Sequence, residues 1–292
     1  MNSKGAGKRR VLTGAAAAVI AGAAFGAFAL TGTASAGPGT ITGATVDVVS
    51  QSGKHEPKPT IVLEHGAFAD SSSWNGVISR LRTDGYPVVA AANPLRGPHS
   101  DATALRGLLD HIKGPKILVG HSYGGSVISE AAADDPDAKA LVYVAAFLPA
   151  PGETALELTN KYPGSTLPGT LDPVAITNPD GTKGTDLYIQ QDKFRHQFAA
   201  DVPRNEAALA AAGQRPIAQA ALEEKATVAA WKTIPSWAVV TTQDLNIPVA
   251  AQRFMAERAD AHITEVAASH SVAVSRPGIV TRVIEDAARA TR

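Results

Sequence analysis

The chain has 292 residues, 45% hydrophobic and 18% charged, so it can bury a sizeable core and does not belong to the disordered class. All 27 acidic residues but only 23 of the 27 basic ones follow residue 36, and this main part contains no basic run. Because nucleic acid is bound by clustered Lys and Arg, the balance excludes a nucleic-acid partner.

The first 36 residues have the pattern of an export signal. The basic stretch MNSKGAGKRR is followed by the apolar stretch VLTGAAAAVIAGAAFGAFAL and by the small residues ASA at 34–36. A membrane anchor is the alternative, but this stretch is mostly Ala and Gly and ends in a processing site. We therefore expect residues 1–36 to be a cleaved signal peptide, export by the Sec or twin-arginine route, and a secreted chain with no stable membrane association.

The sequence contains no cysteine at all. An exported chain of this composition has no disulfides, no thiol nucleophile and no thiolate metal site. Its stability must come from packing.

From residue 60 onward, strand-like and helix-like stretches alternate. Short runs rich in Val, Ile, Leu or Ala, bounded by Gly or Pro, predict strands. The predicted strands are 60–66, 87–94, 116–122, 139–149, 236–244 and 261–269, and the predicted helices are 73–83, 104–112, 125–135, 248–259 and 276–290. Strands separated by helices indicate a parallel sheet covered on both faces. We predict an α/β fold over residues 37–292, with a doubly wound, mostly parallel sheet.

The segment from about 149 to 234 interrupts this alternation. It contains the turn sequence NPDG at 178–181, which suits a hairpin, and the helix-like stretches 205–213 and 217–231. A segment of this length between two sheet strands is too structured for a plain loop. We expect it to form a cap over the carboxyl edge of the sheet, where ligands bind in such folds.

A candidate nucleophile lies in the stretch KILVGHSYGGSVI (116–128). Gly120, Ser122 and Gly124 match G-x-S-x-G, a pattern that is weak alone but gains weight where a predicted strand meets a predicted helix. The alternative is an ordinary strand-to-helix turn that needs glycine. The elbow interpretation places the Ser122 hydroxyl at a helix N-terminus, exposed for attack.

A serine nucleophile needs a base and an orienting acid. Of eight histidines, His270 follows a late strand, in the loop ahead of the terminal helix. Asp244 directly follows the stretch SWAVVTTQ, which gives the order Ser, Asp, His of α/β-hydrolases. Glu153 competes for the acid role, although a solvated residue at the start of the cap is the simpler interpretation.

The stretch LEHGAFADSSSW (63–74) predicts an oxyanion hole at the end of an early strand. By position, the backbone amides of Ala67 and Tyr123 would hold the developing negative charge. Phe68 is the alternative donor and a candidate substrate contact. We expect His65 to brace this loop and Trp74 to pack against the first helix.

These stretches resemble the α/β-hydrolase superfamily. VLEHGAFADSSSW, VGHSYGG, VYVAAFLPAPGE and the region from Thr241 to His270 are most similar to small esterases of the plant methylesterase and hydroxynitrile lyase type and their bacterial relatives. The resemblance covers about Thr60 to the C-terminus and is weakest in the cap. It implies the same catalytic residues, Ser122, Asp244 and His270, with oxyanion amides at Ala67 and Tyr123, and it implies that no metal or organic cofactor is required.

The superfamily catalyses several reactions, so the resemblance does not fix the function. Serine at the elbow disfavours the dehalogenases and epoxide hydrolases of this fold, which use Asp there, and the absence of Lys near Asp244 disfavours cyanohydrin cleavage. A perhydrolase, an acyltransferase and a slow-turnover receptor remain alternatives. We predict hydrolysis of a small or medium uncharged carboxylic ester in a largely apolar pocket. The expected partner is this small-molecule substrate, and the oligomeric state is left open.

Overall fold

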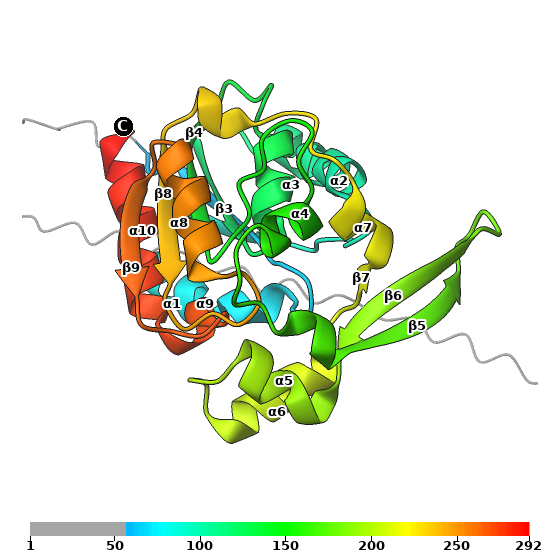
Figure 1. The fold of residues 1–292 in the computed structure, drawn as a ribbon. Coiled ribbons are helices and arrows are strands. Elements are labelled where there is room, and N and C mark those ends of the chain that lie inside the picture. The colour runs from blue at the N-terminus through cyan, green and yellow to red at the C-terminus, as the bar shows by residue number, and fades with distance from the viewer. Residues whose placement is uncertain (1–56, 292) are drawn as a thin grey trace, which may run out of the picture. The chain divides into compact units, whose positions relative to one another are not determined.

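A six-stranded sheet forms the centre of the fold, in the order β2-β1-β3-β4-β8-β9 with every neighbouring pair parallel (Figure 1). The computed structural model describes residues 57–291, so the predicted signal peptide lies outside the described residues. The strands are β1 (Thr60–Glu64), β2 (Val88–Ala91), β3 (Lys116–His121), β4 (Ala138–Val144), β8 (Ser236–Thr241) and β9 (His262–Val266). The strand order reverses between β1 and β3, the place where open α/β sheets bind ligands.

Helices cover both faces of this sheet. On one face Ile61 and Leu63 share a core with α1 (Asn75–Thr83), α9 (Val272–Ser275) and α10 (Pro277–Ala290). On the other face Val62 and Leu118 share a core with α2 (Pro98–His111), α3 (Gly124–Ala131) and α8 (Val249–Arg258). Successive strand residues point to opposite faces, so a strand buried on both sides is apolar throughout. The predicted doubly wound α/β fold is confirmed.

Residues 149–234, here called the inserted segment, lie between β4 and β8 and contain most of the irregular structure. Their elements are α4 (Ala155–Asn160), the 3-10 helix η2 (Leu167–Thr170), β5 (Leu171–Thr177), β6 (Lys183–Ile189), α5 (Gln191–Phe198), α6 (Arg204–Gly213), β7 (Ile217–Ala218), α7 (Gln219–Glu223) and the 3-10 helix η3 (Ala230–Lys232). Strands β5, β6 and β7 form a second, antiparallel sheet. The NPDG sequence connects β5 and β6, where the Asn178 amide donates to the Thr182 carbonyl at 2.8 Å.

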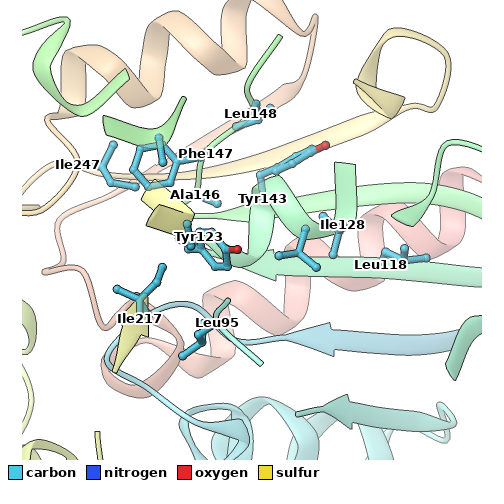
Figure 2. Close-up of a cluster of buried hydrophobic side chains, with 14 of the residues drawn as sticks. Leu95, Leu118, Tyr123, Ile128, Tyr143, Ala146, Phe147, Leu148, Ile217 and Ile247 are labelled. Atoms are coloured by element: carbon cyan, nitrogen blue, oxygen red, sulfur yellow. The ribbon is translucent and has the colours of Figure 1, made fainter. Parts of the chain in front are cut away.

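One core joins the inserted segment to the main sheet. Ile217 from β7 belongs to the same apolar cluster as Leu118 of β3, Tyr123 and Phe147. Figure 2 shows Tyr123 between Leu95 and Ile217 on one side and Ala146 and Phe147 on the other. The inserted segment is therefore packed against the end of the sheet by buried apolar side chains.

Two expectations about helices need correction. The stretch 217–231 is not one helix, because Ile217 and Ala218 pair with β6 and only Gln219–Glu223 is helical. Tertiary pairing here overrides local helix preference. Helix α2 begins at Pro98 instead of near residue 104, since proline suits the first helical position and the Asp101 carboxylate accepts the amides of Arg96 and Gly97.

Among residues 57–291, no helix combines the length and apolar character needed to cross a bilayer.

A buried carboxyl group lies at the end of β1. Glu64 is 1% exposed, and its Oε2 atom has no hydrogen-bond partner. Burial, with a smaller contribution from the nearby Asp101 carboxylate, raises the pKa of Glu64 to about 8. The folded chain therefore keeps a proton that the unfolded chain releases near the ordinary glutamate pKa of 4.5.

The raised pKa predicts a stability change between these two values. The unfolded state binds fewer protons there, so the free energy of unfolding falls as pH rises and the full contribution is present only below the unfolded pKa. We expect Glu64→Gln to remove this loss of stability. The difference in the free energy of unfolding, variant minus wild type, should then rise by ~1 kcal/mol per pH unit between about pH 5 and about pH 8. Urea unfolding across this range measures it, with the exposed Glu206→Gln as control. Parallel pH profiles for the wild type and Glu64→Gln would contradict the prediction.

Candidate active site

Ser122 occupies a sharp turn between β3 and α3. Its φ of 53° lies in the left-handed region, which a side chain adopts only under constraint from its surroundings. The turn is tight because Gly120 lacks a side chain: a Cβ there would lie 2.6 Å from the Gly124 carbonyl oxygen. The strained serine at the end of a buried strand has the geometry of a nucleophile elbow.

His270 and Asp244 meet at the same edge of the sheet. The His270 Nδ1 atom lies 2.7 Å from Asp244 Oδ2, and both side chains are almost fully buried. Asp244 follows the end of β8 by three residues, and His270 lies in the loop between β9 and α9. The pairing at Nδ1 leaves Nε2 as the nitrogen that can exchange a proton with another group.

Ser122 and His270 line the same cavity. Within residues 57–291, the hydrogen bond of the His270 ring is the one to Asp244, and none joins the ring to the Ser122 hydroxyl. The structure thus brings together the three residues that the sequence predicted as Ser, Asp and His.

The Asp244 carboxylate is fully hydrogen-bonded despite its burial. Oδ1 accepts the backbone amides of Asn246 at 2.7 Å and Ile247 at 3.0 Å, and Oδ2 accepts from Thr241 Oγ1 and Gln252 Nε2, both at 2.9 Å. Burial alone would raise the pKa of Asp244, but the facing His270 ring and these donors outweigh it and hold the pKa below its usual value. The carboxylate is therefore ionised and fixed beside His270.

Two backbone amides beside Ser122 are free to bind an oxyanion. The Phe68 amide donates to the Arg215 carbonyl at 3.0 Å, so this alternative donor is already occupied. Within residues 57–291, the Ala67 and Tyr123 amides have no such partner. Gly66 allows this loop to approach, because a Cβ at Gly66 would lie 2.7 Å from the Ser122 Cβ. The geometry favours Ala67 and Tyr123 as the donors.

Comparisons with known proteins identify the family of this chain. A family model described as "Alpha/beta hydrolase family" matches residues 61–283. The chain belongs to this family. The expected α/β-hydrolase fold and the expected hydrolase class are thereby confirmed.

Two curated proteins and one solved structure are similar to this chain at 18–28% sequence identity. The chain is 28% identical to "Pyrethroid hydrolase" of Sphingobium wenxiniae, covering 79% of this chain and 88% of that protein. It is 27% identical to "Alpha/beta hydrolase nvfD" of Aspergillus novofumigatus, covering 79% of this chain and 97% of that protein. Among solved structures, polyneuridine aldehyde esterase superposes with a TM-score of 0.69 at 18% identity, covering 78% of this chain and 98% of that chain.

Glu153, the competing acid, is engaged elsewhere. Its carboxylate forms two hydrogen bonds with the Arg258 guanidinium, at 2.7 and 2.8 Å, and accepts the Ala150 amide at 2.9 Å. Burial acts to raise the pKa of Glu153, but Arg258 outweighs it and lowers the pKa. The His270 ring pairs with Asp244 and not with Glu153.

Two further histidines hold the backbone around the site. His65 Nδ1 donates to the Gly66 carbonyl at 2.9 Å, and its Nε2 accepts the Asn93 amide at 3.1 Å, which agrees with a bracing role. His121 Nε2 donates to the His270 carbonyl at 2.9 Å. Burial, reinforced by the neighbouring His270, lowers the pKa of His121 to about 3, so this ring stays neutral and keeps that donor. No role for His121 was predicted from the sequence pattern.

Tyr123 is fixed through its side chain as well. Its hydroxyl donates to Asp101 Oδ2 at 2.8 Å beneath the elbow. This bond holds in place the residue whose backbone amide is a predicted oxyanion donor.

A small apolar cavity of about 80 Å³ lies at Ser122. Its walls include Ala67, Phe68 and Phe147 from the main fold, together with residues of α4, η2 and α7. Phe68 also lines a second cavity, of about 350 Å³, and its ring packs edge-on against Phe198 at 6.2 Å between centroids. Phe68 is thus a wall residue of both cavities. Within residues 57–291, no group of three or more His, Cys, Asp or Glu side chains is arranged to hold a metal ion.

Proposed function

We propose that this chain is an exported serine hydrolase that cleaves a small or medium carboxylic ester without a cofactor. The observation that carries the proposal is the contact of 2.7 Å between His270 Nδ1 and Asp244 Oδ2, with Ser122 on the wall of the same cavity. The names of two relatives, "Pyrethroid hydrolase" and "Esterase PIR7B" of Oryza sativa, support a hydrolytic role.

The reaction follows from the positions of these groups. His270 Nε2 removes the Ser122 proton while Oγ attacks the ester carbonyl carbon, and the amides of Ala67 and Tyr123 stabilise the resulting oxyanion. When the carbon–oxygen bond to the alcohol breaks, His270 returns the proton to the departing alcohol. Water then attacks the acyl-enzyme with the same proton transfers and releases the acid.

Export is the second part of the proposal. It is supported by the basic, apolar and small-residue pattern of residues 1–36. The mass of the exported protein reports the cleavage, and a chain that starts at Gly37 is the expected product.

The size of the cavity predicts short acyl groups. A largely closed, apolar cavity of about 80 Å³ has little room for a long chain. In a series of p-nitrophenyl esters we expect the highest kcat/KM for acyl chains of about two to eight carbons, with casein and emulsified long-chain triglyceride turned over poorly. A rate jump at the triglyceride solubility limit would contradict the small-ester proposal. Saturable binding with near-zero turnover would favour a receptor.

Substitution of Phe68, which lines both cavities, tests whether cavity size limits the length of the acyl chain. Phe68→Ala joins the cavity of about 80 Å³ to its neighbour of about 350 Å³, so we expect the optimum to move to longer acyl chains. Phe254→Ala, in α8 and outside both cavities, is the matched control and should leave the optimum unchanged. An unchanged optimum in Phe68→Ala would mean that Phe68 does not limit chain length.

A further inference from the structure

Asn246, one of the residues that line the cavity at Ser122, carries an unused hydrogen-bond donor. The side-chain Nδ2 of Asn246 is buried and has no hydrogen-bond partner. Of the buried side-chain atoms without a partner in residues 57–291, it is the one that belongs to a residue lining this cavity. A buried donor left unpaired costs free energy, so such groups are rare and call for an explanation.

The orientation of the Asn246 amide follows from an unambiguous neighbour. The Leu245 backbone carbonyl can only accept, so the Gln197 atom 2.8 Å from it must be the Nε2 donor. The same Nε2 lies 2.7 Å from the Asn246 side chain, which must present its Oδ1 acceptor there. Nδ2 is therefore the atom on the other side of the amide.

Further hydrogen bonds fix the side chain of Gln197 and the backbone of Asn246. Gln197 Oε1 accepts from Thr166 Oγ1 at 2.8 Å, which uses the remaining end of the glutamine amide. The Asn246 backbone amide donates to Asp244 Oδ1 at 2.7 Å. Asn246 is thus fixed next to the acid that orients His270, and Gln197 on α5 of the inserted segment sets which end of its amide is free.

We propose that Asn246 Nδ2 donates a hydrogen bond to the substrate, and that the substrate carries an oxygen acceptor, such as an ether, hydroxyl or carbonyl group, close to the scissile ester. This inference rests on the proposed ester hydrolysis and names the substrate class more closely. In the proposal Gln197 is a positioning residue, because it acts through Asn246.

Pairs of esters that differ by one CH₂-to-oxygen exchange test the inference. On the acyl side the pair is p-nitrophenyl butyrate and p-nitrophenyl methoxyacetate; on the alcohol side it is butyl acetate and 2-methoxyethyl acetate. For each pair the ratio of kcat/KM, ether member over hydrocarbon member, is compared between enzyme variants. Differences in intrinsic reactivity are the same for every variant and cancel.

Three variants and a control distinguish a hydrogen bond from Asn246 to the substrate from a purely structural role of Asn246 in the loop that carries Asp244. Asn246→Leu removes the donor, and Asn246→Asp keeps an acceptor for Gln197 Nε2 while removing the donor. We expect each to lower the ratio about 10- to 100-fold in one of the two pairs. Gln197→Met frees the Asn246 amide to turn and should lower the same ratio by a smaller factor. Asn205→Leu, exposed on α6 and outside the cavity, should leave both ratios as in the wild type.

The outcomes that overturn the inference are distinct from failure of the proposed function. If Asn246→Leu and Asn246→Asp slow both members of each pair equally, Asn246 only supports the acid loop and the inference is wrong. If their ratios and rates equal those of the wild type, Asn246 has no part in recognition. If the wild type hydrolyses no member of either pair, ester hydrolysis itself is wrong, and the inference falls with it. Thermal unfolding of each variant identifies any that fails to fold, and the other Asn246 variant then decides.

Discussion

Ser122→Ala is expected to lower kcat for a short p-nitrophenyl ester by about 10⁵- to 10⁶-fold, and His270→Ala is expected to have an effect of the same size. The two residues act as one unit, because the serine hydroxyl is a poor nucleophile until the imidazole accepts its proton. The double variant is therefore expected to be little slower than either single variant. Stopped-flow or long-time absorbance assays of p-nitrophenolate release measure all three.

Ser126→Ala is a matched control for this prediction. Ser126 lies four residues after Ser122, is buried in α3, and does not line the cavity. It should retain a rate close to that of the wild type. A Ser122→Ala enzyme with a tenth of the wild-type activity would rule out Ser122 as the nucleophile.

Asp244→Asn is expected to lower kcat by about 10³- to 10⁴-fold while leaving the chain folded. The amide is close in shape to the carboxylate, but it no longer fixes the tautomer and orientation of His270 or stabilises the imidazolium that forms during the reaction. The 2.7 Å contact with Nδ1 is the interaction that the substitution changes. Steady-state kinetics with the same ester, alongside circular dichroism, separate this loss from unfolding.

Glu153→Gln provides the comparison. Its carboxylate binds Arg258, so the substitution should remove an ion pair of the inserted segment and have only a mild effect on kcat. If Glu153→Gln proves far more damaging than Asp244→Asn, the acid role belongs to Glu153.

The candidate triad could be predicted from sequence because each member follows a recognisable strand. Ser122 comes directly after β3, and Asp244 and His270 follow the last two strands in chain order. In a parallel sheet the carboxyl ends of the strands meet at one edge, so strand assignment alone places these residues near one another. The oxyanion loop after β1 follows the same rule.

The contacts that hold the candidate triad residues in place could not be predicted from strand assignment. Gln197 and Asn246 are 49 residues apart, and their contact depends on how α5 of the inserted segment packs. Likewise, Ile217 reads locally as part of a helix, yet it pairs with Leu187 of β6. Such contacts arise from tertiary packing, which leaves no periodic signal in the sequence.

Helix α5 links the inserted segment to the two loops that carry Asp244 and His270 of the candidate triad. Gln197 bonds the loop that carries Asp244, and the Phe198 carbonyl accepts the Ser271 amide at 3.0 Å, next to His270. The Phe198 ring packs against the His270 ring at 4.9 Å between centroids. Changes in this helix should therefore alter catalysis as well as substrate choice.

Covalent labelling identifies the nucleophilic side chain. The protein is incubated with an alkyl fluorophosphonate, digested, and analysed by peptide mass spectrometry. We expect one phosphonyl group per chain, on Ser122, with loss of ester hydrolysis in proportion to labelling and slow labelling in His270→Ala. An enzyme that loses activity through a label on another serine, or that stays active while Ser122 is fully labelled, would contradict it.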